Sequence, residues 1–305
     1  MNSQNTLDYP NNNTIFMVWN FNTDRNYTDA FKRLCNLISN LNNSAATRFP
    51  NAKASVVLGI GYEAWHLLDL PQPLPKEFVS FQPITGNKHQ AVATRGDLHL
   101  HIRSDAYSFC IDTASAITDV LTDVAECIDE THGFRYWDSR SILGFVDGTE
   151  NPQGDERPFF GIIGGEDPDY QGGSYLFVQK YIHDIKAWKA LPVNEQEKVI
   201  GRSKTDDIEM SDDIKPANSH SALANLGDSL KIVRDNMPFG TMGTNEMGTY
   251  FIAYASSFQT VTKMLTNMFI GSPEGNYDRI LDFSTPKTGT LFFVPTFDML
   301  DSFSE

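Results

Sequence analysis

Cysteine is scarce in this 305-residue sequence, which contains only Cys35, Cys110 and Cys127. The number is odd, and no Cys-X-X-Cys spacing occurs. Both facts argue against a disulfide framework, a zinc ribbon, an iron–sulfur cluster and a covalently attached c-type haem. Cys35 and Cys127 occupy apolar positions with helical spacing, which favours buried free thiols.

Basic residues and long apolar runs are scarce as well. The chain has 24 Lys and Arg against 39 Asp and Glu, a formal net charge of -15. Such a charge repels nucleic acid and anionic membrane surfaces, so we expect neither partner. No apolar run approaches the roughly 18 residues of a membrane span. The first residues are polar and do not resemble a secretory signal, so we expect a cytoplasmic protein.

Apolar material is nevertheless plentiful, because hydrophobic residues make up 40% of the chain. The first half alternates between extended and helical patterns. Strands are predicted at residues 14–21, 54–60, 97–103 and 133–137, and helices along 31–41, with Thr28 as N-cap, and along 117–128. The strand at 97–103 alternates apolar and polar residues, which predicts one buried and one solvated face.

The second half repeats this order of elements. Strands are predicted at residues 174–178, 230–233, 250–254 and 290–295, and helices around 185–188 and along 261–268. Each half therefore follows the β-α-β-β-α-β order of the ferredoxin-like motif. We predict an α+β fold of two ferredoxin-like halves with antiparallel sheets, residues 1–143 and 144–305. A polar insertion at 201–227 is unusually long for a compact domain, and such loops are often functional or disordered.

Two histidines on the predicted strand, His99 and His101, form a His-X-His pair. Such a pair on a strand can bind a metal ion, which would fit a simple metal hydrolase. No third ligand is obvious nearby in the sequence. The favoured interpretation is that both histidines belong to the polar face of a sheet.

The most informative segment is Gly144–Pro152, with the sequence GFVDGTENP. It places one carboxylate, Asp147, among turn-forming residues. An Asp-Gly turn between two elements is the simple interpretation. A loop held by a rigid scaffold can also aim a carboxylate at a ligand, and the segment alone does not separate these alternatives.

Two further positions gain meaning together with this loop. His220 lies in the polar insertion, within PANSHS, and Arg234 follows fourteen positions later in IVRDNMPFG. Taken alone, a loop histidine is commonly solvated or hydrogen-bonded, and an arginine after a strand is commonly a surface charge.

The three segments in this order resemble the dye-decolourising peroxidase family, whose haem enzymes have a GxxDG motif, a histidine ligand and an arginine. The resemblance also covers GDLHLHIR at 96–103, HGFRYWDSR at 132–140, GRSK at 201–204 and GTLFFVP at 289–295. The length and the Arg-Asp-Asn sequence resemble the shorter bacterial branch, called B-type. The family fold is two ferredoxin-like halves with haem in the C-terminal half, which agrees with the pattern above.

The resemblance implies that His220 is the iron ligand of a non-covalent haem b. A ligating imidazole needs a partner for its second nitrogen. Asp278 matches the family's position for that acid, and Asp282 is the competing choice. Structural alternatives for Asp278 are a helix cap or a salt bridge.

On the other haem face, the resemblance implies that Asp147 is the general base that moves a peroxide proton. Arg234 would stabilise the negative charge on the departing oxygen and could reach a haem propionate, and Asn236 could order a water. Gly148, Thr149 and Arg202 are the remaining cofactor-binding candidates.

The implied function is a peroxidase that uses hydrogen peroxide to oxidise dyes, phenols or other one-electron donors through an oxyferryl intermediate. The alternative is a non-enzymatic haem-handling protein: a haem chaperone, a store or an iron-releasing protein. The implied partners are peroxide and a small reducing substrate, and relatives commonly form homo-oligomers, dimers or larger.

Overall fold

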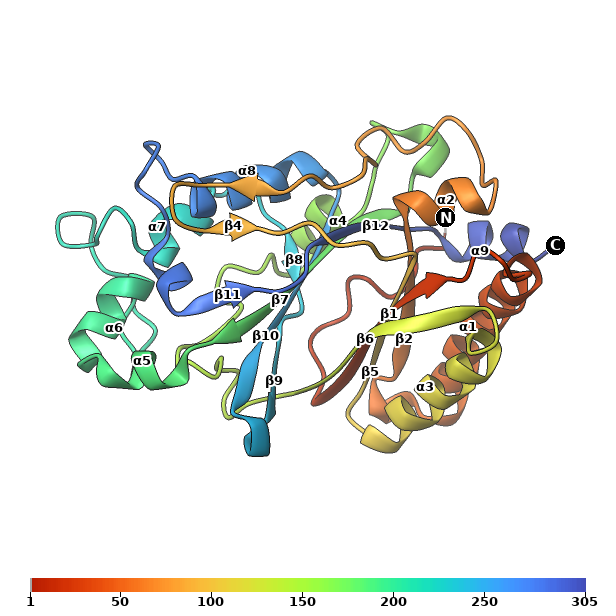
Figure 1. Ribbon diagram of the computed structural model, residues 1–305, viewed down its shortest axis with the longest axis horizontal. Helices are drawn as coiled ribbons and strands as arrows, with labels where there is room; N and C mark the ends of the chain where they lie inside the picture. Colours follow the sequence, from red (N-terminus) through yellow and green to blue (C-terminus); the bar gives the residue numbers. More distant parts are fainter. Residues whose placement is uncertain (1) are drawn as a thin grey trace.

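Two four-stranded antiparallel sheets organise the computed structural model, which describes residues 2–305 (Figure 1). The first sheet contains β1 (Asn13–Phe21), β2 (Ser55–Gly61), β5 (Leu98–Ser104) and β6 (Ala125–Phe134). Their order across the sheet is β6-β1-β5-β2. Counted along the chain this is 4-1-3-2, with every neighbouring pair antiparallel. The first half therefore has the ferredoxin-like arrangement.

The second sheet repeats this arrangement. It contains β7 (Ser174–His183), β9 (Met237–Thr241), β10 (Glu246–Ala255) and β12 (Thr290–Val294). The order β12-β7-β10-β9 is again 4-1-3-2. The predicted α+β fold of two ferredoxin-like halves is thus confirmed.

The two sheets join along both edges. Phe292 and Phe293 of β12 pair with Gly61 and Ile60 of β2, and Gly133 of β6 pairs with Phe239 of β9. Because β7 also pairs with β10, the eight strands close into a ring. Two short strands add further pairings: β8 (Val233–Arg234) pairs with β10, and β11 (Ser284–Pro286) pairs with β7.

Helices cover the outer faces of both sheets (Figure 1). On the first sheet lie α1 (Thr28–Arg48) and α3 (Tyr107–Leu121), and α9 (Phe297–Ser304) packs on α1. The second sheet carries α8 (Phe258–Phe269). The remaining helices are α2 (Tyr62–Leu67), α4 (Glu156–Gly161), α5 (Ile185–Ala190), α6 (Val193–Ile200), α7 (His220–Ala224) and the short 3-10 turns η1 (Pro50–Ala52), η2 (Pro168–Tyr170), η3 (Met242–Thr244) and η4 (Arg279–Asp282). Within residues 2–305, no helix combines the length and the apolar character that membrane crossing requires.

The halves also exchange short segments. The hairpin of β3 (Ile84–Thr85) and β4 (Gln90–Ala91) leaves the first half and lies against α8 (Figure 1). Lys88 in its turn pairs with Asp282, at an Nζ–Oδ1 distance of 2.6 Å. In the opposite direction, α9 brings the Asp301 carboxylate within 3.1 Å of the Ser39 hydroxyl on α1.

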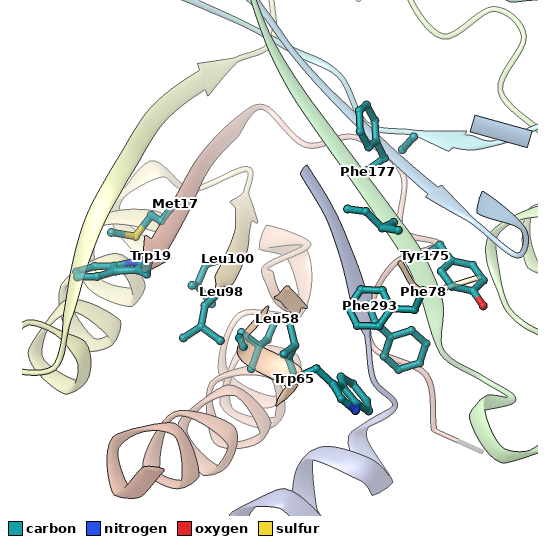
Figure 2. Packing of buried hydrophobic residues seen from close by; sticks show 14 of the residues in the cluster. Met17, Trp19, Leu58, Trp65, Phe78, Leu98, Leu100, Tyr175, Phe177 and Phe293 are labelled. Atoms are coloured by element: carbon teal, nitrogen blue, oxygen red, sulfur yellow. The ribbon is translucent and has the colours of Figure 1, made fainter. Parts of the chain in front are cut away.

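Aliphatic and large aromatic residues together form the core between sheets and helices. Figure 2 shows this cluster, which continues from Trp19 and Leu98 in the first half to Phe177 and Phe293 in the second. Trp65 packs edge-on against Phe293, with ring centroids 5.5 Å apart. A second cluster fills the ring interior, where Phe16 and Tyr250 stack at 4.0 Å. The apolar core is therefore continuous across both halves.

The polar face predicted for β5 is buried, which corrects the sequence analysis. All of β5 is buried, because its second face points into the ring interior rather than to solvent. There His99 Nε2 lies 3.2 Å from the Tyr250 hydroxyl, and His101 Nδ1 lies 2.8 Å from that of Tyr254. The two histidines bridge the two sheets.

Several predicted boundaries were also wrong. The helix predicted along 117–128 ends at Leu121, and Ala125–Phe134 forms β6, which includes only the first two residues of the short strand predicted at 133–137. Ile128 fitted the helical spacing but is an exposed strand residue, and Cys127 is only half-buried. The strand predicted at 230–233 is reduced to β8, and α1 has Tyr27 rather than Thr28 as its N-cap.

A buried ion pair joins the two halves inside the ring. Arg103 of β5 donates from Nη1 to Asp235 Oδ2, and neither side chain is exposed by more than 1%. Arg103 also donates to Ser55 Oγ at 3.1 Å and to the Asn5 carbonyl. Asp235 lies between Arg234 and Asn236, so the pair fixes a segment that contains two candidate site residues.

We expect Arg103→Met to lower the free energy of unfolding by about 3–5 kcal/mol, because it leaves the Asp235 carboxylate buried and unpaired. Equilibrium unfolding in urea measures the change. The double variant Arg103→Met/Asp235→Leu should recover most of the loss, and Arg25→Met on the exposed surface should cost less than about 0.5 kcal/mol. A loss below about 1 kcal/mol in the single variant would contradict this role.

Complete burial lowers the pKa of His99 to about 3. In the unfolded chain the imidazole regains a pKa of about 6.5. As pH falls from that value towards about 3, His99 binds a proton in the unfolded state but not in the folded state, so the free energy of unfolding declines. We expect His99→Gln to reduce the slope of unfolding free energy against pH by up to about 1.4 kcal/mol per unit in this window. The control is His66→Gln on the surface, and equal slopes in all three proteins would exclude the effect.

Candidate active site

Two adjoining pockets in the C-terminal half form one candidate site. They enclose about 830 and 850 Å³ of empty space, part of which is open to solvent. Asp147, His220 and Arg234 line both pockets. The structure thus brings together the three residues on which the sequence analysis placed the site, although they are spread over 88 positions of the chain.

His220 is the first residue of α7 and is fixed from behind by an acid. Its Nδ1 lies 2.7 Å from Asp278 Oδ2. Asp278 is fully buried, and its other oxygen accepts a bond from the Ile280 backbone N–H at 3.0 Å. The carboxylate is therefore held at both ends. With Nδ1 engaged, Nε2 is the ring nitrogen available to a ligand in the cavity.

The competing acid, Asp282, lies elsewhere. Its Oδ1 is 2.6 Å from Lys88 Nζ and 3.0 Å from His89 Nε2, and it also accepts a bond from the Tyr277 hydroxyl. Asp282 therefore anchors the β3–β4 hairpin, whereas Asp278 contacts His220.

Burial and the charged groups around His220 shift its pKa in opposite directions. Burial lowers the pKa of the imidazole, but the Asp278 carboxylate raises it by more, so the pKa of His220 lies above its ordinary value. Arg234 lowers the same pKa and Asp147 raises it. The dominant partner is Asp278, which makes the ring electron-rich and fixes its orientation.

Asp147 reaches the cavity from a tight turn. Its backbone N–H donates to the Ser139 carbonyl at 2.9 Å, and Gly148 follows with φ of +87°, which a residue with a side chain adopts only with strain. Asn236 Nδ2 donates to Asp147 Oδ2 at 3.2 Å, while Asn236 Oδ1 accepts from the Ile252 N–H at 3.2 Å. Asn236 thus connects the Asp147 carboxylate to β10.

Asn151 is a residue that the sequence analysis missed. Its side-chain amide donates to the Arg234 carbonyl and accepts from the Arg234 N–H, both at 2.8 Å. This pair of bonds ties the loop of Asp147 to β8. Asparagine within a turn motif was a possible signal, but its partner lies 83 positions away.

The other cofactor-binding candidates line the first pocket. Gly148, Thr149 and Arg202 all lie there. Thr149 Oγ1 donates to Asp207 Oδ2 at 2.6 Å, and Arg202 Nε donates to Asp207 Oδ1 at 2.8 Å. Asp207 thus joins the polar insertion to the loop of Asp147, and its place in the insertion carried no sequence signal.

The second pocket has a largely apolar wall. Phe251 of β10 and Met264, Leu265 and Met268 of α8 line it. Phe239 and Phe269 line neither pocket and belong to the core.

Comparisons with known proteins agree with this geometry. Residues 10–135 match the family described as Dyp-type peroxidase, N-terminal, and residues 138–299 match Dyp-type peroxidase, C-terminal. The chain is 50% identical over 291 residues to a dye-decolorizing peroxidase of Rhodococcus erythropolis, covering 94% of this chain and 84% of the relative.

Solved structures give the same result. A dye-decolorizing peroxidase from Bacteroides thetaiotaomicron superposes with a TM-score of 0.97 at 50% identity, covering 99% of this chain and 98% of that one. A variant of DypB from Rhodococcus jostii RHA1, solved in complex with heme, has a TM-score of 0.91 at 42% identity and covers 98% of each chain. The chain is therefore an enzyme of the Dyp-type peroxidase family.

Proposed function

We propose that this enzyme is a haem b peroxidase that uses hydrogen peroxide to oxidise dyes, phenols or other one-electron donors. One observation carries the proposal: an imidazole backed by a buried carboxylate shares a cavity with an acid and a guanidinium. The heme named for the DypB variant supports the choice of cofactor.

The described residues fit a non-covalent haem. His220 would bind the iron through Nε2, because Nδ1 is held by Asp278. The apolar wall from α8 and β10 suits the porphyrin face. Arg234 lines the same pocket, where it would contact either a haem propionate or the peroxide. Gly148, Thr149 and Arg202 would border the same group. When bound, haem supplies an iron centre that takes up peroxide and accepts reducing equivalents one at a time.

The protein's own residues would handle the proton and the charge. Asp147 acts as the general base: it accepts a proton from peroxide at a carboxylate oxygen and returns it to the departing oxygen. Arg234 stabilises the negative charge that develops on that oxygen. Asn236 holds the carboxylate in position through its 3.2 Å bond and could order a water molecule there.

A non-enzymatic haem-handling role is the weaker alternative. Such a protein needs His220, but it has no need of a carboxylate and a guanidinium held in the same cavity by Asn236 and Asn151. We further propose that the chain divides into residues 1–143 and 144–305, following the repeated order of elements, and that its location is cytoplasmic. From the family resemblance we propose assembly into a homo-oligomer, a dimer or larger.

We expect His220→Ala to lose tight haem binding and, with it, peroxide-dependent oxidation of a dye at mildly acidic pH, because the cavity loses the imidazole that would hold the iron. The measurement is the Soret absorbance after haem is supplied, followed by the dye assay. His66→Ala, which removes an exposed histidine, is the matched control. A normal Soret band in His220→Ala would contradict the ligand assignment, and a wild type that binds haem without oxidising any dye would favour haem handling.

We expect Asp147→Ala and Arg234→Ala both to slow the reaction with peroxide, with Arg234→Ala at least as slow. Loss of a general base or of a stabilising charge typically costs about 10²–10⁴-fold. Stopped-flow recording of the Soret change after mixing haem-loaded protein with peroxide measures the rate. Wild-type rates in both variants would exclude these roles.

A further inference from the structure

A third cavity opens on the far side of Asp147, away from α8. It encloses about 1030 Å³ of empty space, part of which is open to solvent, and we call it the vestibule. Tyr9 and Lys53 contribute to it from the N-terminal half, and Arg135 and Arg140 from the segment after β6. Asp147, Arg234 and Asn236 line both the vestibule and the second pocket. These three side chains therefore form the partition between the vestibule and the proposed haem cavity.

The charge of the vestibule contrasts with that of the whole chain. Its cationic lining residues in the described structure are Lys53, Arg135, Arg140, Arg157 and Arg234, and its anionic one is Asp147. The complete chain carries a formal charge of -15. A concave surface lined by one sign of charge concentrates ions of the opposite sign.

Three of these guanidiniums form no salt bridge in the described structure. Within residues 2–305, Arg135, Arg157 and Arg234 have no carboxylate within 4.0 Å, unlike Arg140, whose Nε is 2.9 Å from Asp138. Arg157 is 3% exposed and donates to the backbone carbonyls of Leu7 and Asp8 at 2.9 and 3.0 Å. Hydrogen bonds to these carbonyl oxygens satisfy the N–H groups of Arg157 but do not neutralise its positive charge. Arg135 lies exposed at the rim and donates to the Ser139 hydroxyl.

We propose that the vestibule is a binding site for a small oxyanion, of the size of sulfate or a simple carboxylate, and that the bound anion obstructs the path of peroxide to Asp147. Guanidinium groups bind such anions through paired, charge-assisted hydrogen bonds. An anion held beside the partition occupies the space through which a solute from the vestibule reaches the Asp147 carboxylate. The obstruction rests on the proposed peroxidase function, whereas anion binding does not.

Sulfate is the probe, titrated calorimetrically into the haem-loaded protein at constant ionic strength set by sodium chloride. We expect one site in the wild type, with affinity lowered about tenfold in Arg135→Gln, since one charge-assisted bond contributes about that factor. Arg135→Lys should regain part of the affinity. Arg25→Gln, which removes the same charge from a distant exposed position, should bind as the wild type does.

Absence of binding in the wild type, or equal weakening in Arg135→Gln and Arg25→Gln, would overturn the site. The Soret band must stay unchanged by sulfate, because a shift would place the ion at the iron rather than in the vestibule. In the second part of the experiment, sulfate should slow the reaction of the wild type with peroxide and affect Arg135→Gln only at about tenfold higher concentration. Specific binding without slowing would refute the obstruction, and specific binding to a protein that does not react with peroxide at all would refute the peroxidase instead.

Discussion

The buried pair of Arg103 and Asp235 is the interaction on which the arrangement of the site depends. It is formed between β5 of one half and the β8–β9 connection of the other, with both groups removed from solvent. Extended backbone sends consecutive side chains to opposite sides, so anchoring Asp235 in the ring interior directs its neighbours Arg234 and Asn236 towards the cavity. The N-terminal half, which contributes neither the candidate iron ligand nor the candidate general base, thereby fixes the geometry of both flanking residues.

Local patterns predicted much of the fold. Alternation and helical spacing located most of the long strands and helices, because these signals depend on residues close in the chain. They predicted only the last two residues of β6 and none of β9, yet the order of elements identified two ferredoxin-like halves. The errors came from long-range contacts. His99, His101 and Arg103 suggested a solvated face, yet that face is buried because a second sheet covers it. Ile128 extended a helical spacing by coincidence, and burial in β6 follows a period of two instead.

At the candidate site, too, local motifs could be predicted from the sequence and long-range contacts could not. Motifs identified Asp147, His220 and Arg234, and the resemblance offered Asp278 and Asp282 as alternatives for the acid beside the histidine. Spacing along the chain could not choose between those two aspartates, since the decision lies in η4, where Asp278 caps the turn beside His220 and Asp282 points to Lys88. Asn151 and Asp207 were invisible for a related reason: each acts through a partner that only the folded chain brings close.

The exchange of segments between the halves has a consequence for how the molecule comes apart. With α9 docked on α1 and the β3–β4 hairpin latched to Asp282, neither half can detach without exposing apolar surface on the other. Cooperative units of this kind open together rather than one after the other. A cofactor bound only by residues of the C-terminal half would therefore stabilise the entire cooperative unit. Its binding would also slow amide hydrogen exchange in β1, on the opposite side of the ring.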